Sequence, residues 1–326
     1  MTEPLLRIRN LRVWFPVGTA LFGKPAQLRA VDGVDFDLQA GEALGIVGES
    51  GCGKSTLARA ILRLVPSTAG QIVWMGQSIE GWSNRQVRPL RRDLQIVFQD
   101  PLASLDPRMT VGEIVAEPLR VHAPKLSRAE RRERVADILR RVGLSPDVIN
   151  RYPHEFSGGQ CQRIGIARAM VLRPKLLVCD EPVSALDVSI QAQIVNLLQD
   201  LKRDFGMSIL FVSHNLAVVR KLCERVLVLY LGKPMELAPT EMLYSDPRHP
   251  YTRGLLAAVP IPDPAVQPLR LGTALGGELP SPLSPPSGCV FRTRCPMAEP
   301  QCAATAPTFD EVSEAHQVAC WRWREK

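Results

Sequence analysis

The sequence of 326 residues lacks any long run of consecutive apolar residues, although 45% of its residues are hydrophobic. A membrane-spanning helix needs about 20 such residues, so we expect no segment to cross a membrane. The first residues, MTEPLLRIRN, also lack the basic-then-apolar order of a signal peptide. The chain is therefore expected to be cytoplasmic, with any membrane attachment made through partner proteins. Its length suits one or two domains.

Acidic residues are fewer than basic ones, 33 against 40, which gives a net charge of +7 and a pI near 9.1. Such an excess can indicate nucleic-acid binding. The basic residues are dispersed: Arg85, Arg88, Arg91 and Arg92 lie in one stretch, and others lie in residues 128–141. Acidic residues alternate with the arginines of the second stretch, which is typical of a solvated helix face. We therefore favour solvated faces over a nucleic-acid site, with a role near a membrane surface as the alternative.

Residues 48–56 read GESGCGKST and fit the phosphate-binding pattern G-x-x-x-x-G-K-[ST]. An apolar strand pattern over 42–47 precedes them, and Leu57, Ile61 and Leu64 follow at helical spacing. Glycines let backbone N–H groups converge on a phosphate, and the next helix directs its positive end at the same anion. The predicted nucleotide-binding residues are Gly48, Glu49, Ser50, Gly51, Cys52, Gly53, Lys54, Ser55 and Thr56.

Two side chains of this loop carry specific chemistry. Lys54 supplies a cation for the outer phosphates, and Ser55 offers a hydroxyl to Mg²⁺. The alternative, a glycine-rich turn before an ordinary helix, leaves both residues unexplained. The motif predicts a nucleoside triphosphate but does not say what its hydrolysis drives.

A second apolar run, residues 176–181, ends in two acids, which is typical of a buried parallel strand. Ligands of open α/β sheets bind at the carboxyl ends of such strands. Asp180 is expected to hold Mg²⁺, and Glu181 to accept a proton from attacking water. The alternative is a strand end with two solvated acids.

Between these motifs, residues 156–160 read FSGGQ and open an amphipathic helix. Ser157 is a favourable N-cap, and two glycines at a helix N-terminus suit close approach to an anion. From the residues alone, an ordinary capped helix remains the alternative.

The order phosphate loop, SGGQ, CDEP resembles the ABC ATPase family, and the resemblance covers roughly residues 5–235. Other family landmarks follow the expected order: Phe15 as the adenine platform, Gln99 of the Q-loop, Ser184–Asp187 as the D-loop, and His214 as the switch histidine. Two positions depart from the common pattern, Cys161 after SGGQ and Asn215 after the histidine, and neither removes a catalytic group.

The resemblance implies that two such domains close head to tail around two ATP molecules. The signature residues would then cover the nucleotide of the partner: Ser157, Gly158, Gly159 and Gln160. Glu181 would polarise the water and His214 would hold the γ-phosphate. Gln99 would report the nucleotide state to a partner and contact Mg²⁺ together with Ser55 and Asp180.

The resemblance also divides the chain. Residues 1–245 are expected to form an α/β P-loop ATPase domain. A helical subdomain at about 100–156, with Ser127 capping a helix over 128–142, would contact a membrane partner. Helix over 189–205 and strands over 208–212 and 226–230 imply a largely parallel sheet. Residues 246–326 form a proline-rich extension in which we expect little regular structure. The prolines that mark it are Pro260, Pro262, Pro264, Pro268, Pro280, Pro282, Pro285 and Pro286.

Four of the eight cysteines lie in this extension: Cys289, Cys295, Cys302 and Cys320. Their spacing is not that of a standard zinc finger, and a cytosolic location disfavours disulfides. Spacing alone leaves unligated thiols, Zn²⁺ or an iron–sulfur cluster open. Residues 246–253 and 288–296 resemble the extension of oligopeptide and dipeptide importer ATPases, some of which carry a [4Fe–4S] cluster. This implies structural cluster ligation, with Zn²⁺ as the alternative.

The favoured function is the ATP-hydrolysing subunit of a bacterial peptide importer. Its partners would be two transmembrane subunits, an extracytoplasmic binding protein and a second similar ATPase, at the cytoplasmic face of the membrane. Nickel and glutathione are alternative cargoes. A soluble ABC ATPase of DNA repair or translation is disfavoured, because the chain has one phosphate loop and no sustained heptads. A non-catalytic nucleotide sensor is disfavoured by the presence of Glu181 and His214.

Overall fold

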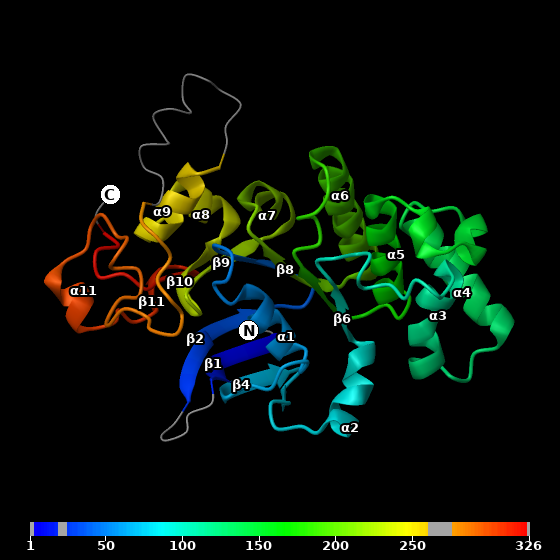
Figure 1. The fold of residues 1–326 in the computed structure, drawn as a ribbon, viewed down its shortest axis with the longest axis horizontal. Helices are drawn as coiled ribbons and strands as arrows, with labels where there is room; N and C mark the ends of the chain where they lie inside the picture. The colour runs from blue at the N-terminus through cyan, green and yellow to red at the C-terminus, as the bar shows by residue number, and fades with distance from the viewer. Residues whose placement is uncertain (1–2, 19–24, 260–275, 325–326) are drawn as a thin grey trace. The chain divides into compact units, whose positions relative to one another are not determined.

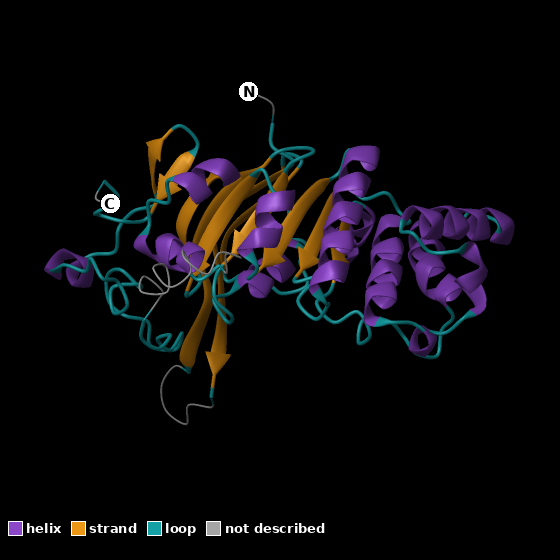
Figure 2. Ribbon diagram, turned by 90° about the horizontal axis from the view of Figure 1, so that it is seen from above, coloured by secondary structure: helices purple, strands orange, loops and turns teal. Residues whose placement is uncertain are grey.

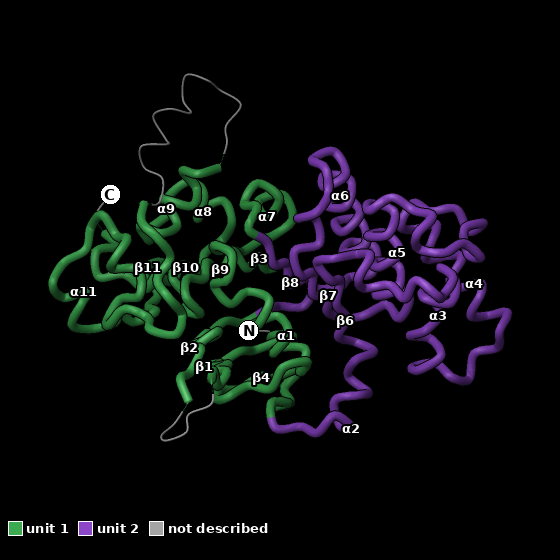
Figure 3. Tube along the Cα trace, in the orientation of Figure 1, with its two compact units in different colours: residues 1–37, 44–80, 214–326 green, residues 38–43, 81–213 purple. Residues whose placement is uncertain are grey.

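The computed structural model describes residues 3–18, 25–259 and 276–324, and these form two compact units (Figure 3). The first unit combines residues 1–37, 44–80 and 214–326, and the second combines residues 38–43 and 81–213. Segments far apart in the sequence thus share a unit.

An antiparallel sheet in the first unit has the strand order β2-β1-β4-β5 (Figure 1). Its strands are β1 (Leu6–Val17), β2 (Ala26–Leu38), β4 (Ala69–Trp74) and β5 (Gln77–Ser78). In β1 the apolar residues Leu6 and Ile8 are buried, while Arg7 and Arg9, which alternate with them, are half-buried. This alternation places one face of the strand in the core.

The second sheet of this unit is mixed. Strand β9 (Arg225–Tyr230) pairs in parallel with β3 (Ala43–Val47) and antiparallel with β10 (Lys233–Pro239). Strand β12 (His316–Val318) extends it beside β10, and β11 (Asp310–Ser313) follows. The helices of the unit are α1 (Lys54–Ile61), α7 (Leu216–Leu222), α8 (Thr240–Ser245), α9 (Pro250–Ala257) and α11 (Pro300–Ala304).

The prediction of little regular structure after residue 245 was wrong in part. Helix α9 begins at Pro250, whose fixed φ suits the first helical turn, and His249 caps it by accepting the Tyr251 N–H. The β11–β12 hairpin pairs with β10 and so covers its edge. The later prolines from Pro280 to Pro286 do lie in turns and loops. The earlier ones, from Pro260 to Pro268, lie outside the described residues.

The second unit contains the parallel strands β6 (Leu94–Val97), β7 (Leu176–Asp180) and β8 (Ser208–Ser213). Every residue of β7 and β8 is buried, as the apolar runs predicted. The remaining segments of this sheet region are α2 (Asn84–Val87), the 3₁₀ helix Arg88–Arg92 and α6 (Val188–Phe205). The parallel pairing was predicted, whereas the antiparallel sheet of the first unit was not.

The rest of the second unit is helical, and Figure 2 shows helices without intervening strands at that end. They are α3 (Val111–His122), α4 (Arg128–Arg141) and α5 (Gly158–Met170), with short 3₁₀ turns at Pro146–Asn150 and Pro153–Glu155. Reciprocal capping boxes start α3, α4 and α5 at Thr110, Ser127 and Ser157. The predicted caps at Ser127 and Ser157 are confirmed. Across the residues that the structure describes, no helix is long and apolar enough to cross a bilayer.

Candidate functional site

The loop of residues 48–56 joins β3 to α1 in the first unit, as the strand–loop–helix pattern predicted. Gly53 has φ 103°, and a Cβ there would lie 1.9 Å from the Ala30 carbonyl oxygen. A Cβ on Gly48 would lie 2.2 Å from the Leu229 carbonyl oxygen. Only glycine fits at either position, so the loop backbone packs directly against neighbouring backbone.

Lys54 is only 4% exposed, and its ammonium lies inside the loop. It donates to the Gly48 carbonyl oxygen at 2.9 Å and the Glu49 carbonyl oxygen at 3.0 Å. A buried ammonium needs such acceptors to offset its lost hydration. The loop therefore holds a buried cation, the charge that a polyphosphate requires.

Cys52 lies in the same loop and is 1% exposed. A position near a helix N-terminus can lower the pKa of a thiol. Burial instead raises the pKa of Cys52, and the Lys54 charge offsets this only in part. Cys52 is therefore a packing residue.

The acidic strand end lies in the second unit. Asp180 is completely buried at the end of β7, and Glu181 follows it with φ 48°. A left-handed backbone costs a residue other than glycine about 1–2 kcal/mol. The Glu181 N–H donates to the Val212 carbonyl oxygen at 3.0 Å, and the Ser184 hydroxyl donates to the Glu181 carbonyl oxygen at 3.0 Å. These two hydrogen bonds stabilise the strained backbone of Glu181 and so fix the position of its carboxylate.

Gln99 follows β6 and is exposed. Its Nε2 donates to Glu181 Oε2 at 3.3 Å, so the structure brings together two residues 82 positions apart that the sequence placed in one site. An amide bonded to this carboxylate can orient it.

At the start of α5, Ser157 Oγ accepts the Gln160 N–H at 3.4 Å and Gln160 Oε1 accepts the Ser157 N–H at 3.0 Å. A Cβ on Gly159 would lie 2.7 Å from Ile190 Cγ2 in α6. A Cβ on Gly158 would meet only ordinary contact at 3.7 Å. Gly159 thus has a packing requirement that the sequence did not reveal.

The other residues that the sequence singled out lie at the ends of strands or at helices, as follows. His214 is exposed directly after β8, and Asn215 caps α7 by accepting the N–H groups of Ala217 and Val218. Phe15 is half-buried near the end of β1. Cys161 is buried in α5, and its thiol donates to the Pro153 carbonyl oxygen at 3.5 Å.

The sequence did not indicate that the C-terminal residues contact the phosphate loop. Arg294 donates to both carboxylate oxygens of Glu49, at 2.6 and 3.0 Å. The Glu49 N–H donates to the Tyr251 hydroxyl at 2.9 Å. The contacting residues are more than 200 positions from Glu49 in the sequence, and no short pattern signals the contact.

The four C-terminal cysteines are half-buried free thiols. Burial, together with the charges of the other three thiols, raises the pKa of Cys320 to about 11, so the four lie near one another. Among the described residues, however, no three or more His, Cys, Asp or Glu side chains are arranged to hold a metal ion. The side-chain arrangement therefore does not support the predicted cluster.

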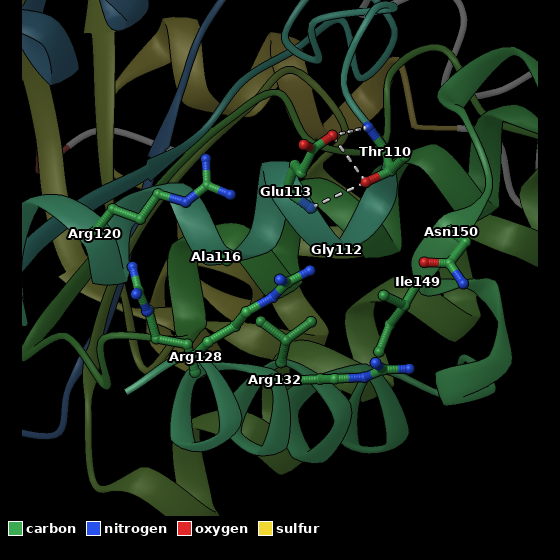
Figure 4. A pocket seen from close by; sticks show the side chains of 11 residues that line it. Thr110, Gly112, Glu113, Ala116, Arg120, Arg128, Arg132, Ile149 and Asn150 are labelled. Atoms are coloured by element: carbon green, nitrogen blue, oxygen red, sulfur yellow. Dashed lines mark hydrogen bonds between the residues drawn. The ribbon is translucent and has the colours of Figure 1, made fainter. Parts of the chain in front are cut away.

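A pocket of about 470 Å³ lies between α3, α4 and the turn Pro146–Asn150 of the second unit (Figure 4). Its lining includes the guanidinium groups of Arg120, Arg128, Arg131 and Arg132. Figure 4 shows the single lining carboxylate, Glu113, bonded back to Thr110 in the capping box. Charge at the pocket is therefore mainly positive.

Comparison with known proteins gives two family matches along the chain. The ABC transporter model matches residues 31–184, and the model of the oligopeptide/dipeptide transporter C-terminal region matches residues 235–302. The chain is 59% identical to the oligopeptide transport ATP-binding protein OppF of Escherichia coli (strain K12), over 97% of this chain and 95% of that protein. It is 55% identical to the protein of the same name from Haemophilus influenzae, over 98% and 97%.

Solved structures agree. The ATP-binding cassette MJ0796 in its dimeric post-hydrolysis state with ADP and Pi has a TM-score of 0.65 and 29% identity, over 72% of this chain and 98% of that one. The chain cbiO1 from Clostridium perfringens has a TM-score of 0.65 and 26% identity, over 75% and 92%. The predicted fold class is confirmed. The chain belongs to the ABC transporter family, among its ATP-binding subunits, and is an ABC-type ATPase.

Proposed function

We propose that this chain is the ATP-hydrolysing subunit of a bacterial importer of oligopeptides or dipeptides. The observation that carries the proposal is similarity at 59% identity across 97% of the chain to a protein named for oligopeptide transport. The match of residues 235–302 to the C-terminal region of such transporters supports it independently of the ATPase motifs. Nickel and glutathione remain alternative cargoes.

In this function, residues 48–56 bind the phosphates of ATP. The close packing of Gly48 and Gly53 against neighbouring backbone, which fixes the loop, and the enclosed ammonium of Lys54 fit that ligand. Ser55, Gln99 and Asp180 would hold Mg²⁺, which neutralises phosphate charge when it is bound. Phe15 would support the adenine ring.

Glu181 would accept the proton of the attacking water, oriented by the Gln99 amide. His214 would contact the γ-phosphate. Each assignment comes from family resemblance at that position, and the contact between Gln99 and Glu181 adds support for those two residues.

We further propose a head-to-tail dimer with a second, similar ATPase. Ser157, Gly158, Gly159 and Gln160 would cover the nucleotide of the partner. Val188, which follows the D-loop at the start of α6, is 82% exposed, which is unusual for an apolar side chain. A partner subunit at this surface would remove Val188 from water.

Residues at about 100–156 would contact two transmembrane subunits at the cytoplasmic face of the membrane, with a binding protein on the opposite side. The arginine-lined pocket supports an acidic counterpart on the membrane subunit. The division into residues 1–245 as ATPase domain and 246–326 as extension stays a prediction.

The test is co-purification of the tagged chain from native membranes, followed by mass spectrometry. Two multi-span proteins and a second ATPase support the proposal, and the accompanying binding protein identifies the cargo. The double variant Arg128→Gln and Arg132→Gln should reduce recovery of the membrane subunits. The matched control, Arg134→Gln and Arg140→Gln on the same helix, should not. Recovery with ribosomes or repair proteins alone would contradict the transporter.

We also propose that the four cysteines bind a structural iron–sulfur cluster, with Zn²⁺ as the alternative. The proposal comes from the resemblance of residues 246–253 and 288–296 to the extension of importer ATPases. The four thiols are half-buried, and the Cys289 N–H donates to the Cys302 carbonyl oxygen at 2.7 Å. Their side chains would have to turn to ligate an ion. Anaerobically purified protein should contain iron and sulfide, or zinc. Cys289→Ser should remove the metal, while Cys223→Ser should keep it, and metal-free wild-type protein would exclude both forms.

A further inference from the structure

Glu49 is the one acidic residue in the phosphate loop, and its charge is paired with the C-terminal part of the chain. Both carboxylate oxygens accept hydrogen bonds from Arg294, whose side chain is only 5% exposed. Two parallel charge-assisted bonds of this kind are strong and fix orientation. This hydrogen bonding to Glu49 also raises the pKa of Arg294, so the arginine is fully charged.

Arg294 is itself held from other sides. Its Nε donates to the Gly276 carbonyl oxygen at 3.0 Å, and its guanidinium lies 5.8 Å from the centre of the Tyr230 ring. Three residues earlier, Phe291 is completely buried against Tyr230 and Tyr251, at 5.3 Å between ring centres in both cases. Arg294 therefore contacts the phosphate loop from a segment that is anchored by the buried Phe291.

The same aromatic cluster holds the main chain of Glu49. Tyr251, at the start of α9, accepts the Glu49 N–H at 2.9 Å, and its ring lies 4.8 Å from that of Tyr230. The backbone and the side chain of Glu49 are thus both tied to residues beyond position 230. The Glu49 carbonyl oxygen in turn accepts from Lys54 at 3.0 Å.

An unpaired carboxylate at this place would oppose ATP in two ways. It would repel the phosphates, and it would compete for the ammonium of Lys54. Like charges within several ångströms of each other weaken binding by about tenfold or more at protein surfaces. Arg294 removes both effects by neutralising Glu49.

We propose that Arg294 is a positioning residue of the ATP site: it neutralises Glu49 and fixes the start of the phosphate loop, so that the C-terminal extension sets the affinity for ATP. The proposal rests on the proposed function of residues 48–56 in binding phosphate. It assigns an effect on ATP to a segment that the ATPase motifs do not include.

The test measures the dissociation constant of ATP with Mg²⁺ by calorimetry on the purified full chain. Arg294→Gln should weaken ATP binding about tenfold or more, because Glu49 is left charged, and added salt should reduce this loss by screening. The double variant, Glu49→Gln with Arg294→Gln, should recover most of the affinity. Arg292→Gln is the matched control, since the Arg292 guanidinium donates to the carbonyl and hydroxyl oxygens of Ser287.

Wild-type affinity in Arg294→Gln would overturn the proposal. So would a double variant as weak as Arg294→Gln, because the loss would then be structural and not electrostatic. If Arg294→Gln does not fold, Arg294→Lys keeps the charge and should bind ATP within about threefold of wild type; a loss of tenfold or more in that variant, with an unchanged melting temperature, would contradict charge neutralisation. Lys54→Ala tests the underlying function separately: unchanged ATP binding there would reject the phosphate loop itself.

Discussion

Replacing Lys54 by alanine tests the phosphate loop most sharply, because the ammonium is buried and its surroundings are defined. In wild type it donates to two carbonyl oxygens, at 2.9 and 3.0 Å, and is 4% exposed. Each hydrogen bond to a charged group contributes about 1.5–3 kcal/mol. Loss of one such contact to ATP should raise the dissociation constant about 10- to 150-fold.

The same change predicts a thermal signature. ATP at a hundred times its dissociation constant stabilises the folded state by about 2.7 kcal/mol. A hundredfold weaker site at the same ATP concentration retains only about 0.4 kcal/mol. Differential scanning fluorimetry should therefore show a large ATP-induced shift in wild type and almost none in Lys54→Ala. Without ATP, Lys54→Ala should also melt somewhat earlier, because two buried carbonyl oxygens lose their donor.

Lys221→Ala is the control, since Lys221 is exposed on α7 in the same unit. It should keep the full ATP-induced shift. If Lys54→Ala shows the wild-type shift, the ammonium does not bind phosphate and the assignment of residues 48–56 fails.

Three further predictions concern other parts of the chain. Glu181→Gln should leave ATP binding intact and slow hydrolysis at least a hundredfold, because the proton acceptor is lost; an unchanged rate of phosphate release would exclude Glu181 as the base. Gly159→Ala should lower stability by about 1–3 kcal/mol, because its Cβ would lie 2.7 Å from Ile190 Cγ2. Gly165→Ala in the same helix, with nothing within 4 Å, should be neutral or stabilising in the same urea titration, and equal losses would contradict the packing argument. Burial lowers the pKa of His249 to about 4 from its ordinary value near 6.5. The unfolded state then binds more protons, so stability is present above about pH 6.5 and is lost as pH falls toward 4, by at most about 3 kcal/mol. His249→Asn, which keeps a capping acceptor, should flatten that part of the pH profile, and an unchanged profile would show that other groups cause it.

Local features were predictable because their causes are local. Ser127 and Ser157 cap helices through residues three positions away, and the buried strand β7 follows from an unbroken apolar run. The phosphate loop was predictable for the same reason, since its glycines, Lys54 and Ser55 are contiguous.

Features that depend on residues far apart in the chain could not be predicted from local sequence patterns. The hairpin β11–β12 forms because the edge of β10 offers it partners, and nothing within residues 310–318 indicates that edge. The pairing of Glu49 with Arg294 joins residues 245 positions apart. The pKa of Cys52 could not be predicted from its place before a helix, because its burial, which raises that pKa, comes from tertiary packing.

The measurement closest to the central claim is ATP hydrolysis by the complex purified with this chain and reconstituted in lipid vesicles, with and without a saturating oligopeptide and the binding protein. The account predicts that peptide stimulates hydrolysis and is accumulated, and that Glu181→Gln in this chain abolishes accumulation while ATP still binds. Peptide accumulation that continues at the wild-type rate with Glu181→Gln would show that this chain does not drive import.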